Sequence, residues 1–329
     1  MILSLSRRTD IPAFFSEWAI NRLYAGEAYV RTNPFNPKQI THYTFSPESV
    51  DCVVFWTKNP IPMLKSLENK QAAAVLDRYP YYFQFTLTGY GKDVEAGLPE
   101  KNRLIEAFKE LSIRTSKNVV WRYDPIFFNS TYTMDWHLAQ FKRISSELKG
   151  YTDRCVISFI NLYSFVKKTL EGNKVEAQGQ EDVNINKLME FCRSLSSIAR
   201  ENGMNVYSCA EQINLDGAGI LHGACIDKVL VEKVCKYTID TRKDAGQRQE
   251  CHCVQSVDFG KYNTCSNQCR YCYATKKPSE IEDNLKLYNK KSPILCDTIN
   301  TSDEIVEKPL ISFRANDNAD DSYKQLSLF

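Results

Sequence analysis

Three cysteines near the end of the chain have the spacing of ligands to one metal centre. Cys265, Cys269 and Cys272 stand in the run TCSNQCRYCYA, which gives the pattern C-x3-C-x2-C. Three thiolates on one short loop can bind three irons of a 4Fe-4S cluster, whereas four cysteine ligands would saturate it. The fourth iron would then stay open to a small molecule, as in a catalytic metal site. The alternative is a zinc knuckle, which needs a fourth ligand nearby and usually has paired C-x2-C spacing.

The fuller pattern C-x3-C-x-aromatic-C, in which Tyr271 is the aromatic residue, resembles the signature of radical S-adenosylmethionine (SAM) enzymes. The resemblance implies that SAM binds the open iron near Tyr271. Electron transfer would then cleave SAM to a 5'-deoxyadenosyl radical, which abstracts a hydrogen atom from the substrate. An external electron donor such as flavodoxin or ferredoxin is implied as well.

The composition allows one large core or two modest ones, since the chain has 329 residues and is 43% hydrophobic. Twelve cysteines would suggest disulfides in a secreted protein, but the start MILSLSRRTD contains no long apolar stretch. No window approaches about eighteen uninterrupted apolar residues. We therefore expect a cytoplasmic protein with reduced thiols and no membrane span. The net charge of +2 neither requires nor excludes a nucleic acid.

Short apolar, β-branched or aromatic runs alternate with longer stretches of helical periodicity, which predicts parallel βαβ units. We expect an α/β fold: a partial (β/α) barrel of the radical SAM type over 1–250, a cysteine-rich iron-sulfur segment over 251–274 and a flexible tail over 275–329. The predicted strands are 2–5, 52–56, 82–87, 119–122, 155–160 and 205–208, with 29–44 as a further candidate. The predicted helices are 13–25, 62–77, 101–112, 135–148 and 185–201. The polar segment 165–183 has no period and is expected to be a surface loop or mobile lid.

Polar residues follow several predicted strands, and active sites of barrels lie at the carboxyl ends of their strands. The candidates for catalysis are Arg7, Arg8, Lys58, Arg122, Asp124, Asn161 and Glu211, and Ser6 and Asp10 are candidates for cofactor binding. The cations would suit the carboxylate of SAM and an anionic substrate such as a phosphodiester. The alternative is a set of turns and helix caps, which fits Asp10 before Pro12 and Asp124 before Pro125.

Other cysteines gather in the same part of the sequence. Cys209, Cys225, Cys251 and Cys253 can hold a second iron-sulfur cluster, with zinc as an alternative metal. A third possibility is that Cys209 and Cys225 are simply small buried residues, as free cysteines often are. Cys52, Cys155 and Cys192 fall within strand or helix patterns and are expected in the core.

Further runs resemble an uncharacterised bacterial family known for a C-terminal cysteine cluster like that of radical SAM enzymes. They are SRRTDIP, FWTKNP, WRYDPI, SCAE and GACID, followed by C-x-C and C-x3-C-x2-C, and they cover about residues 1–275. A more distant similarity reaches spore photoproduct lyase, a radical SAM enzyme of DNA repair, through WTKN, YYFQFTLTGYGKDVEAGLPEKNRLIEAFKEL and a strand ending in DPI. In that lyase the cysteine motif precedes these elements, so here the cysteine loop would have to fold back across the barrel mouth.

The last residues are Gln325, Leu326, Ser327, Leu328 and Phe329, and they follow the polar run RANDNADDSYK. Large apolar residues are rare in flexible segments, so their presence here indicates a partner. QLSLF resembles the pentapeptide that binds the bacterial sliding clamp, in which a Leu-Phe pair anchors in a hydrophobic cleft. The alternative is that the tail docks on its own domain.

Three hypotheses on function follow. The first is a radical SAM enzyme, similar to the lyase, that acts on DNA for repair or base modification and is recruited by the sliding clamp. The second keeps the radical chemistry but has RNA, a peptide or a small metabolite as the substrate. The third is a zinc-binding nucleic-acid module without catalytic activity.

A peptide of the last ten residues is expected to bind the sliding clamp. Burial of Leu328 and Phe329 should contribute about 1.5–3 kcal/mol each. After the loss of chain entropy we expect a dissociation constant near the micromolar range, or about 8 kcal/mol. Calorimetric titration measures it, with a Leu328→Ala/Phe329→Ala peptide as the control. Absence of heat with the natural peptide at high micromolar concentration would remove the clamp from the proposal.

Overall fold

The largest feature of the molecule is a sheet of eight parallel strands. The computed structural model describes residues 1–31, 33 and 35–315. The strand order is β10-β1-β4-β5-β6-β7-β8-β9, and every pairing is parallel. The predicted parallel βαβ units are therefore confirmed. The strands of this sheet are β1 (Ile2–Leu5), β4 (Cys52–Thr57), β5 (Tyr81–Thr86), β6 (Val119–Ile126), β7 (Arg154–Phe159), β8 (Asn205–Cys209), β9 (Leu221–Gly223) and β10 (Val257–Asp258).

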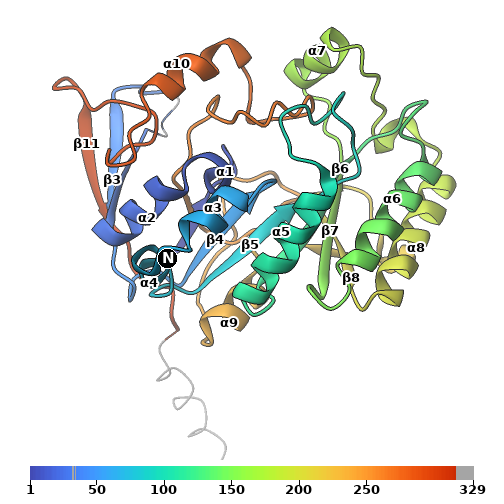
Figure 1. The fold of residues 1–329 in the computed structure, drawn as a ribbon, viewed down its shortest axis with the longest axis horizontal. Coiled ribbons are helices and arrows are strands. Elements are labelled where there is room, and N and C mark those ends of the chain that lie inside the picture. Colours follow the sequence, from blue (N-terminus) through green and yellow to red (C-terminus); the bar gives the residue numbers. More distant parts are fainter. Residues whose placement is uncertain (32, 34, 316–329) are drawn as a thin grey trace, which may run out of the picture.

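Helices alternate with these strands along the chain (Figure 1). In this view α2, α3 and α5 lie in front of the sheet, and α6 packs beside α8 at one end of it. The helices are α1 (Ile11–Phe14), α2 (Ser16–Ala25), α3 (Ile61–Ser66), α4 (Lys70–Leu76), α5 (Lys101–Arg114), α6 (Met134–Glu147), α7 (Ser164–Gly172), α8 (Ile185–Glu201), α9 (Lys228–Cys235) and α10 (Ile281–Lys286), with short 3-10 turns at Gln180–Asp182, Asp216–Ala218 and Pro278–Glu280.

Different parts of the chain pack against the two faces of the sheet. Leu3, Phe55 and Phe83 belong to the large apolar core that the sheet shares with the helices. Side chains alternate between faces along a strand, and the neighbouring Val54 and Tyr82 belong to a second core. In that core they meet residues of 209–254, a stretch whose only α-helix is α9. The second face is thus covered by largely irregular chain.

The chain returns to its first strand through β10. Val257 pairs with Leu3, and Asp258 pairs with Ser4, in the parallel direction. Residues after β10 therefore leave the sheet at the same edge as residues after β1. This pairing brings the cysteine loop, which comes late in the sequence, to the carboxyl end of the sheet.

The predicted strands agree with the observed ones within a few residues, but two predicted helices are interrupted. The helix expected at 13–25 is divided at Phe15 into α1 and α2. The helix expected at 62–77 is divided before α4, where the side chain of Asn69 accepts hydrogen bonds from the amides of Gln71 and Ala72 and so starts a new helix. The expected core cysteines Cys52, Cys155 and Cys192 are fully buried.

The prediction of an irregular loop or mobile lid at 165–183 was wrong in part. α7 occupies the first half of this segment, and its Val166 and Leu170 are buried. They belong to the same apolar cluster as Tyr271 of the cysteine loop. The polar composition of this segment, rich in lysine and glutamate, hid this narrow apolar stripe at helical spacing.

The prediction of a flexible tail over 275–329 was wrong for the part that the structure describes. β2 (Glu27–Val30), β3 (Gln39–Thr44) and β11 (Glu304–Pro309) form a separate three-stranded sheet, in which β11 pairs with β3. The single strand expected at 29–44 is thus two strands. Ile294, Leu295 and Cys296, also from the segment 275–329, are buried. The clamp-like peptide Gln325–Phe329 lies outside the described residues.

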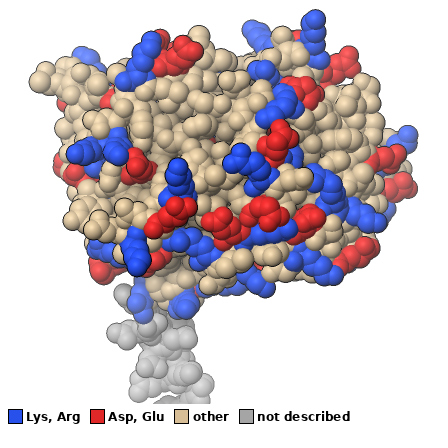
Figure 2. Space-filling model, viewed as in Figure 1, with Lys and Arg blue, Asp and Glu red and all other residues tan. Residues whose placement is uncertain are grey.

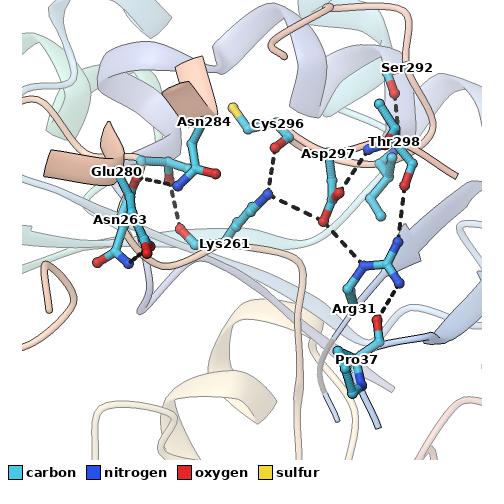
Figure 3. Close-up of polar contacts among 12 residues, drawn as sticks. Arg31, Pro37, Lys261, Asn263, Glu280, Asn284, Ser292, Cys296, Asp297 and Thr298 are labelled. Atoms are coloured by element: carbon cyan, nitrogen blue, oxygen red, sulfur yellow. Dashed lines mark hydrogen bonds and ion pairs between the residues drawn. The ribbon is translucent and has the colours of Figure 1, made fainter. Parts of the chain in front are cut away.

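Charged contacts hold the late segment against the early sheet (Figure 3). Arg31 forms an ion pair with Asp303 at 2.9 Å and another with Asp297 at 3.4 Å. Lys261 reaches the same Asp297 at 3.3 Å and donates to the carbonyl oxygen of Cys296 at 2.7 Å. Residues 261–303 therefore form part of the folded domain.

No α-helix among the described residues has the length and apolar character that a membrane crossing requires.

Candidate functional site

A cavity of about 520 Å3 opens where the strands of the main sheet end. Ligands of parallel α/β sheets bind at this carboxyl end. Nearly all the residues that the sequence singled out line this cavity: Ser6, Arg7, Arg8, Asp10, Lys58, Arg122, Asp124, Asn161, Cys209, Cys225, Cys251, Cys253, Cys265, Cys269, Tyr271 and Cys272.

Glu211 is the exception, and its placement in the main cavity was wrong. The backbone of Ala210 has a φ of +54°, which turns the chain after β8. Glu211 accepts a hydrogen bond from the amide of Phe159 at 2.8 Å and borders a separate cavity of about 200 Å3. Burial raises the pKa of Glu211 to about 7.

The cysteine loop, residues 262–274, is fixed against the segment that follows β5. The amide of Arg270 donates to the carbonyl oxygen of Val94 at 2.9 Å, and the amide of Gly97 donates to that of Asn267 at 3.0 Å. A Cβ atom on Gly97 would lie 2.7 Å from the carbonyl oxygen of Ser266. Only glycine allows this close approach. The loop therefore folds back across the carboxyl ends of the strands, as the late position of the cysteines required.

A buried carboxylate, Glu95, connects this loop to the sheet. Its side chain is 1% exposed and forms ion pairs with Lys58, at 3.1 Å, and with Lys101. The hydroxyl group of Tyr271 donates to the same carboxylate, and Lys58 donates to Tyr271 at 2.7 Å. Burial alone would raise the pKa of Glu95, but the two lysines outweigh it and lower the pKa to about 2.

Asp10 forms a second connection between the loop and the strands. Its carboxylate accepts hydrogen bonds from the hydroxyl of Thr57 at 2.7 Å, the amide of Lys58 at 2.8 Å and the side chain of Asn267 at 2.9 Å. It also caps α1 through the amide of Ala13. The helix-cap alternative was thus correct, and Asp10 positions its neighbours because its acceptors are occupied.

Asp258 gathers the residues that follow β1. It accepts hydrogen bonds from the hydroxyls of Ser4 at 2.8 Å and Ser6 at 2.5 Å, and from the amide of Arg7 at 2.8 Å. The guanidinium groups of Arg7 and Arg8 lie 3.8 and 4.0 Å from the same carboxylate. Among the described residues, Nη1 of Arg7 is buried without a hydrogen-bond partner. Arg7 thus has an unsatisfied donor on a side chain that lines the cavity.

Arg122 and Asp124 form an ion pair on the other side of the cavity. Burial would lower the pKa of Arg122, but the charge of Asp124 raises it well above its usual value. Arg122 also donates to the sulfur of Cys225 at 2.8 Å and lies over the ring of Trp56.

Aromatic side chains lie at the rim. Tyr163, Tyr262 and Tyr273 line the cavity and are 43%, 39% and 49% exposed. The guanidinium of Arg8 lies 5.4 Å from the ring centre of Tyr262. Arg248, which also lines the cavity, donates to the side chain of Asn161 at 2.9 Å. This rim offers flat apolar surfaces beside positive charge.

Sequence reasoning missed Glu95, Asp258 and Arg248. The first two lie in or near sequence motifs that could have indicated them. Glu95 lies within the lyase-like run, and Asp258 follows the C-x-C motif by a few residues. Arg248 lies in irregular chain and has no such signal.

The cysteine loop offers three thiols to the cavity. Within residues 1–31, 33 and 35–315, no group of three or more His, Cys, Asp or Glu side chains is spaced to hold a single metal ion. Cys265, Cys269 and Cys272 all line the cavity, and all three are partly exposed. A donor set of three thiolates fits a cluster that takes its fourth ligand from a small molecule.

A family model described as a domain of unknown function, DUF1848, matches residues 2–274. The chain belongs to this family. No curated protein matches the chain. A crystal structure of a candidate alpha-L-fucosidase from Bacteroides thetaiotaomicron VPI-5482 matches at 11% identity over 72% of this chain and 83% of that one. Its TM-score of 0.25 is too low to support an argument.

Substitution of Glu95 by Gln should lower the free energy of unfolding by about 3–5 kcal/mol near pH 7, because two partly buried lysines lose the buried carboxylate that neutralises them. A carboxylate whose pKa is lowered to about 2 stabilises the fold above its ordinary value of 4.5 and loses that effect as the pH falls toward 2. The difference between the wild type and Glu95→Gln should therefore shrink over this range.

Urea unfolding at a series of pH values measures this difference. Glu106→Gln is the matched control, since its side chain is 72% exposed, and it should change stability by less than about 0.5 kcal/mol. A difference that does not vary with pH would show that Glu95 acts through shape and not through charge.

Proposed function

We propose that this protein is a radical SAM enzyme that acts on DNA. The observation that carries the proposal is the position of the cysteine loop. Cys265, Cys269 and Cys272 lie on a loop fixed over the carboxyl ends of β1, β4 and β5, and they border a cavity lined by arginine and lysine side chains. A volume of about 520 Å3 is within the usual range for small-molecule sites.

The strand order supports the same proposal. β1, β4, β5, β6, β7 and β8 are adjacent in chain order, as expected of the partial (β/α) barrel that radical SAM enzymes use. The cysteine motif follows the strands in this sequence, whereas it precedes them in spore photoproduct lyase. The pairing of β10 with β1 compensates for this different position, because it returns the motif to the edge of the sheet at which β1 ends.

Cys265, Cys269 and Cys272 would hold a 4Fe-4S cluster, whose chemistry when bound is the transfer of one electron from an external donor to SAM, which cleaves it to methionine and a 5'-deoxyadenosyl radical. Arg7 is suited to the carboxylate of SAM, since it lines the cavity and its Nη1 has no hydrogen-bond partner among the described residues. Lys58 and Tyr271 keep the loop in place through Glu95. Ser6 and Asp10, predicted as cofactor contacts, serve as positioning residues here, because their oxygens are engaged with protein groups.

Two features favour DNA as the substrate. The clamp-like peptide would bring the protein to DNA, and the cavity combines exposed tyrosines with arginines, a pairing that suits stacked bases and phosphates. On the face drawn in Figure 2, basic and acidic side chains are interspersed, so that face has no broad basic surface. We therefore propose that a single nucleotide, turned out of its stack, enters the cavity.

Anaerobically reconstituted protein should cleave SAM to 5'-deoxyadenosine after reduction. The variant Cys265→Ala/Cys269→Ala/Cys272→Ala should lose this activity by at least about a hundredfold, since it has no ligands for the cluster. Chromatography of the products measures it, and Cys192→Ala, at a core position away from the cavity, should retain activity. Equal cleavage by the triple variant would refute the assignment.

Tyr262→Ala should weaken the binding of a single-stranded oligonucleotide by about 1–3 kcal/mol, because one stacking surface is lost. Fluorescence anisotropy at fixed salt concentration measures this. Tyr24→Ala is the control, since Tyr24 is 71% exposed and does not line the cavity. If the wild type and both variants bind the oligonucleotide equally well, the cavity does not bind DNA through Tyr262. RNA, peptides or small metabolites would then be tested as substrates.

A further inference from the structure

Four cysteines outside the loop form a continuous buried group beneath the cavity. The sulfurs of Cys209 and Cys225 lie 2.8 Å apart. Cys253 and Cys251 belong to the same buried cluster as Cys209 and Cys225. All four residues are less than 10% exposed, and each lines the cavity. They come from the end of β8, the loop after β9 and the irregular chain before β10, so tertiary folding assembles the group.

The backbone that carries these thiols is held firmly. The carbonyl oxygen of Cys225 accepts hydrogen bonds from the hydroxyl of Tyr82 at 2.8 Å and from the side-chain amide of Gln84 at 2.6 Å. Both donors are buried and belong to β5. The amide of Val254 donates to the carbonyl oxygen of Ile226 at 3.0 Å, which fixes the segment of Cys253 beside that of Cys225. Such support is typical of ligand-bearing loops that must keep their geometry.

Nitrogen donors point at the sulfurs. Arg122 donates to Cys225 at 2.8 Å, and the amide of Ile226 donates to Cys253 at 3.3 Å. Hydrogen bonds from nitrogen to sulfur, together with a nearby cation, stabilise the negative charge of metal-bound thiolates. Ordinary buried thiols need neither, because a neutral thiol packs as a small apolar group.

We propose that Cys209, Cys225, Cys251 and Cys253 form a tetrathiolate centre for a thiophilic metal, either zinc or an iron-sulfur cluster, separate from the cysteine loop. Two ligands of one tetrahedral metal with bonds of about 2.3 Å lie roughly 3.8 Å apart. As the side chains of the described residues stand, no three of them are spaced to hold one metal ion. The sulfurs of Cys209 and Cys225 are closer than this distance, so rotation of the cysteine side chains about the Cα–Cβ bond must accompany metal binding. The fixed backbone can stay in place.

The test uses the full-length chain with Cys265→Ala/Cys269→Ala/Cys272→Ala, so that its result does not depend on SAM cleavage or on the loop. One sample is reconstituted anaerobically with iron and sulfide, and a second is loaded with zinc. The centre should retain about four irons with sulfide, or about one zinc, per chain. X-ray absorption should show sulfur-only coordination at about 2.3 Å.

Adding Cys225→Ser and Cys253→Ser should lower the metal content about tenfold, since two of four ligands are lost. Adding Cys192→Ala should leave it unchanged. If the serine variant does not fold, a second experiment uses the metal-loaded chain that carries only the loop substitutions. An alkylating reagent should label the thiols of the four cysteines only after a chelator has removed the metal. Metal content that survives the serine substitutions, or a metal-free chain with a Cys209–Cys225 disulfide, would overturn the proposal.

Discussion

The carboxylate of Asp258 is the contact on which the arrangement of the cavity depends. It is at the end of β10, yet its hydrogen bonds reach the hydroxyls and the amide of residues 4–7 at the end of β1. Gly260 follows within two residues, and a Cβ atom there would lie 1.9 Å from the hydroxyl of Ser6. The chain can return this closely because that position has no side chain. Without this junction the cysteine loop would not start at the carboxyl end of the sheet.

Glu95 is the second carboxylate that fixes the cysteine loop. Asp258 fixes where the loop starts, and Glu95 fixes its middle through Tyr271 and Lys58. A carboxylate that is 1% exposed is stable as an anion only with nearby cations, and Lys58 and Lys101 provide them. The charge network is therefore part of the fold as well as part of the cavity wall. The same lysine that faces the cavity also holds the wall together.

Much of the fold could be predicted from the sequence, because strands buried on both faces are nearly continuous apolar runs and the helices between them show a clear period. β11 could not: all six of its residues are exposed, so it joins β3 through backbone hydrogen bonds without an apolar pattern. Strand-end reasoning located the cavity but missed Glu95 and Asp258. Their roles arise from contacts between distant parts of the chain, which no local spacing encodes.

A metal bound by the four buried cysteines would help to explain the stability of the irregular chain that covers the second face of the sheet. The chain at 236–256 covers part of this face without a helix or a strand of its own. Long irregular segments in compact domains are uncommon and are usually functional. A metal held by Cys209, Cys225, Cys251 and Cys253 would join this segment to β8 and to the loop after β9. Metal-binding energy would then contribute directly to folding, as it does in structural zinc sites. On this view the floor of the cavity takes its rigidity from the tetrathiolate centre, whereas the helices support the opposite face through apolar packing.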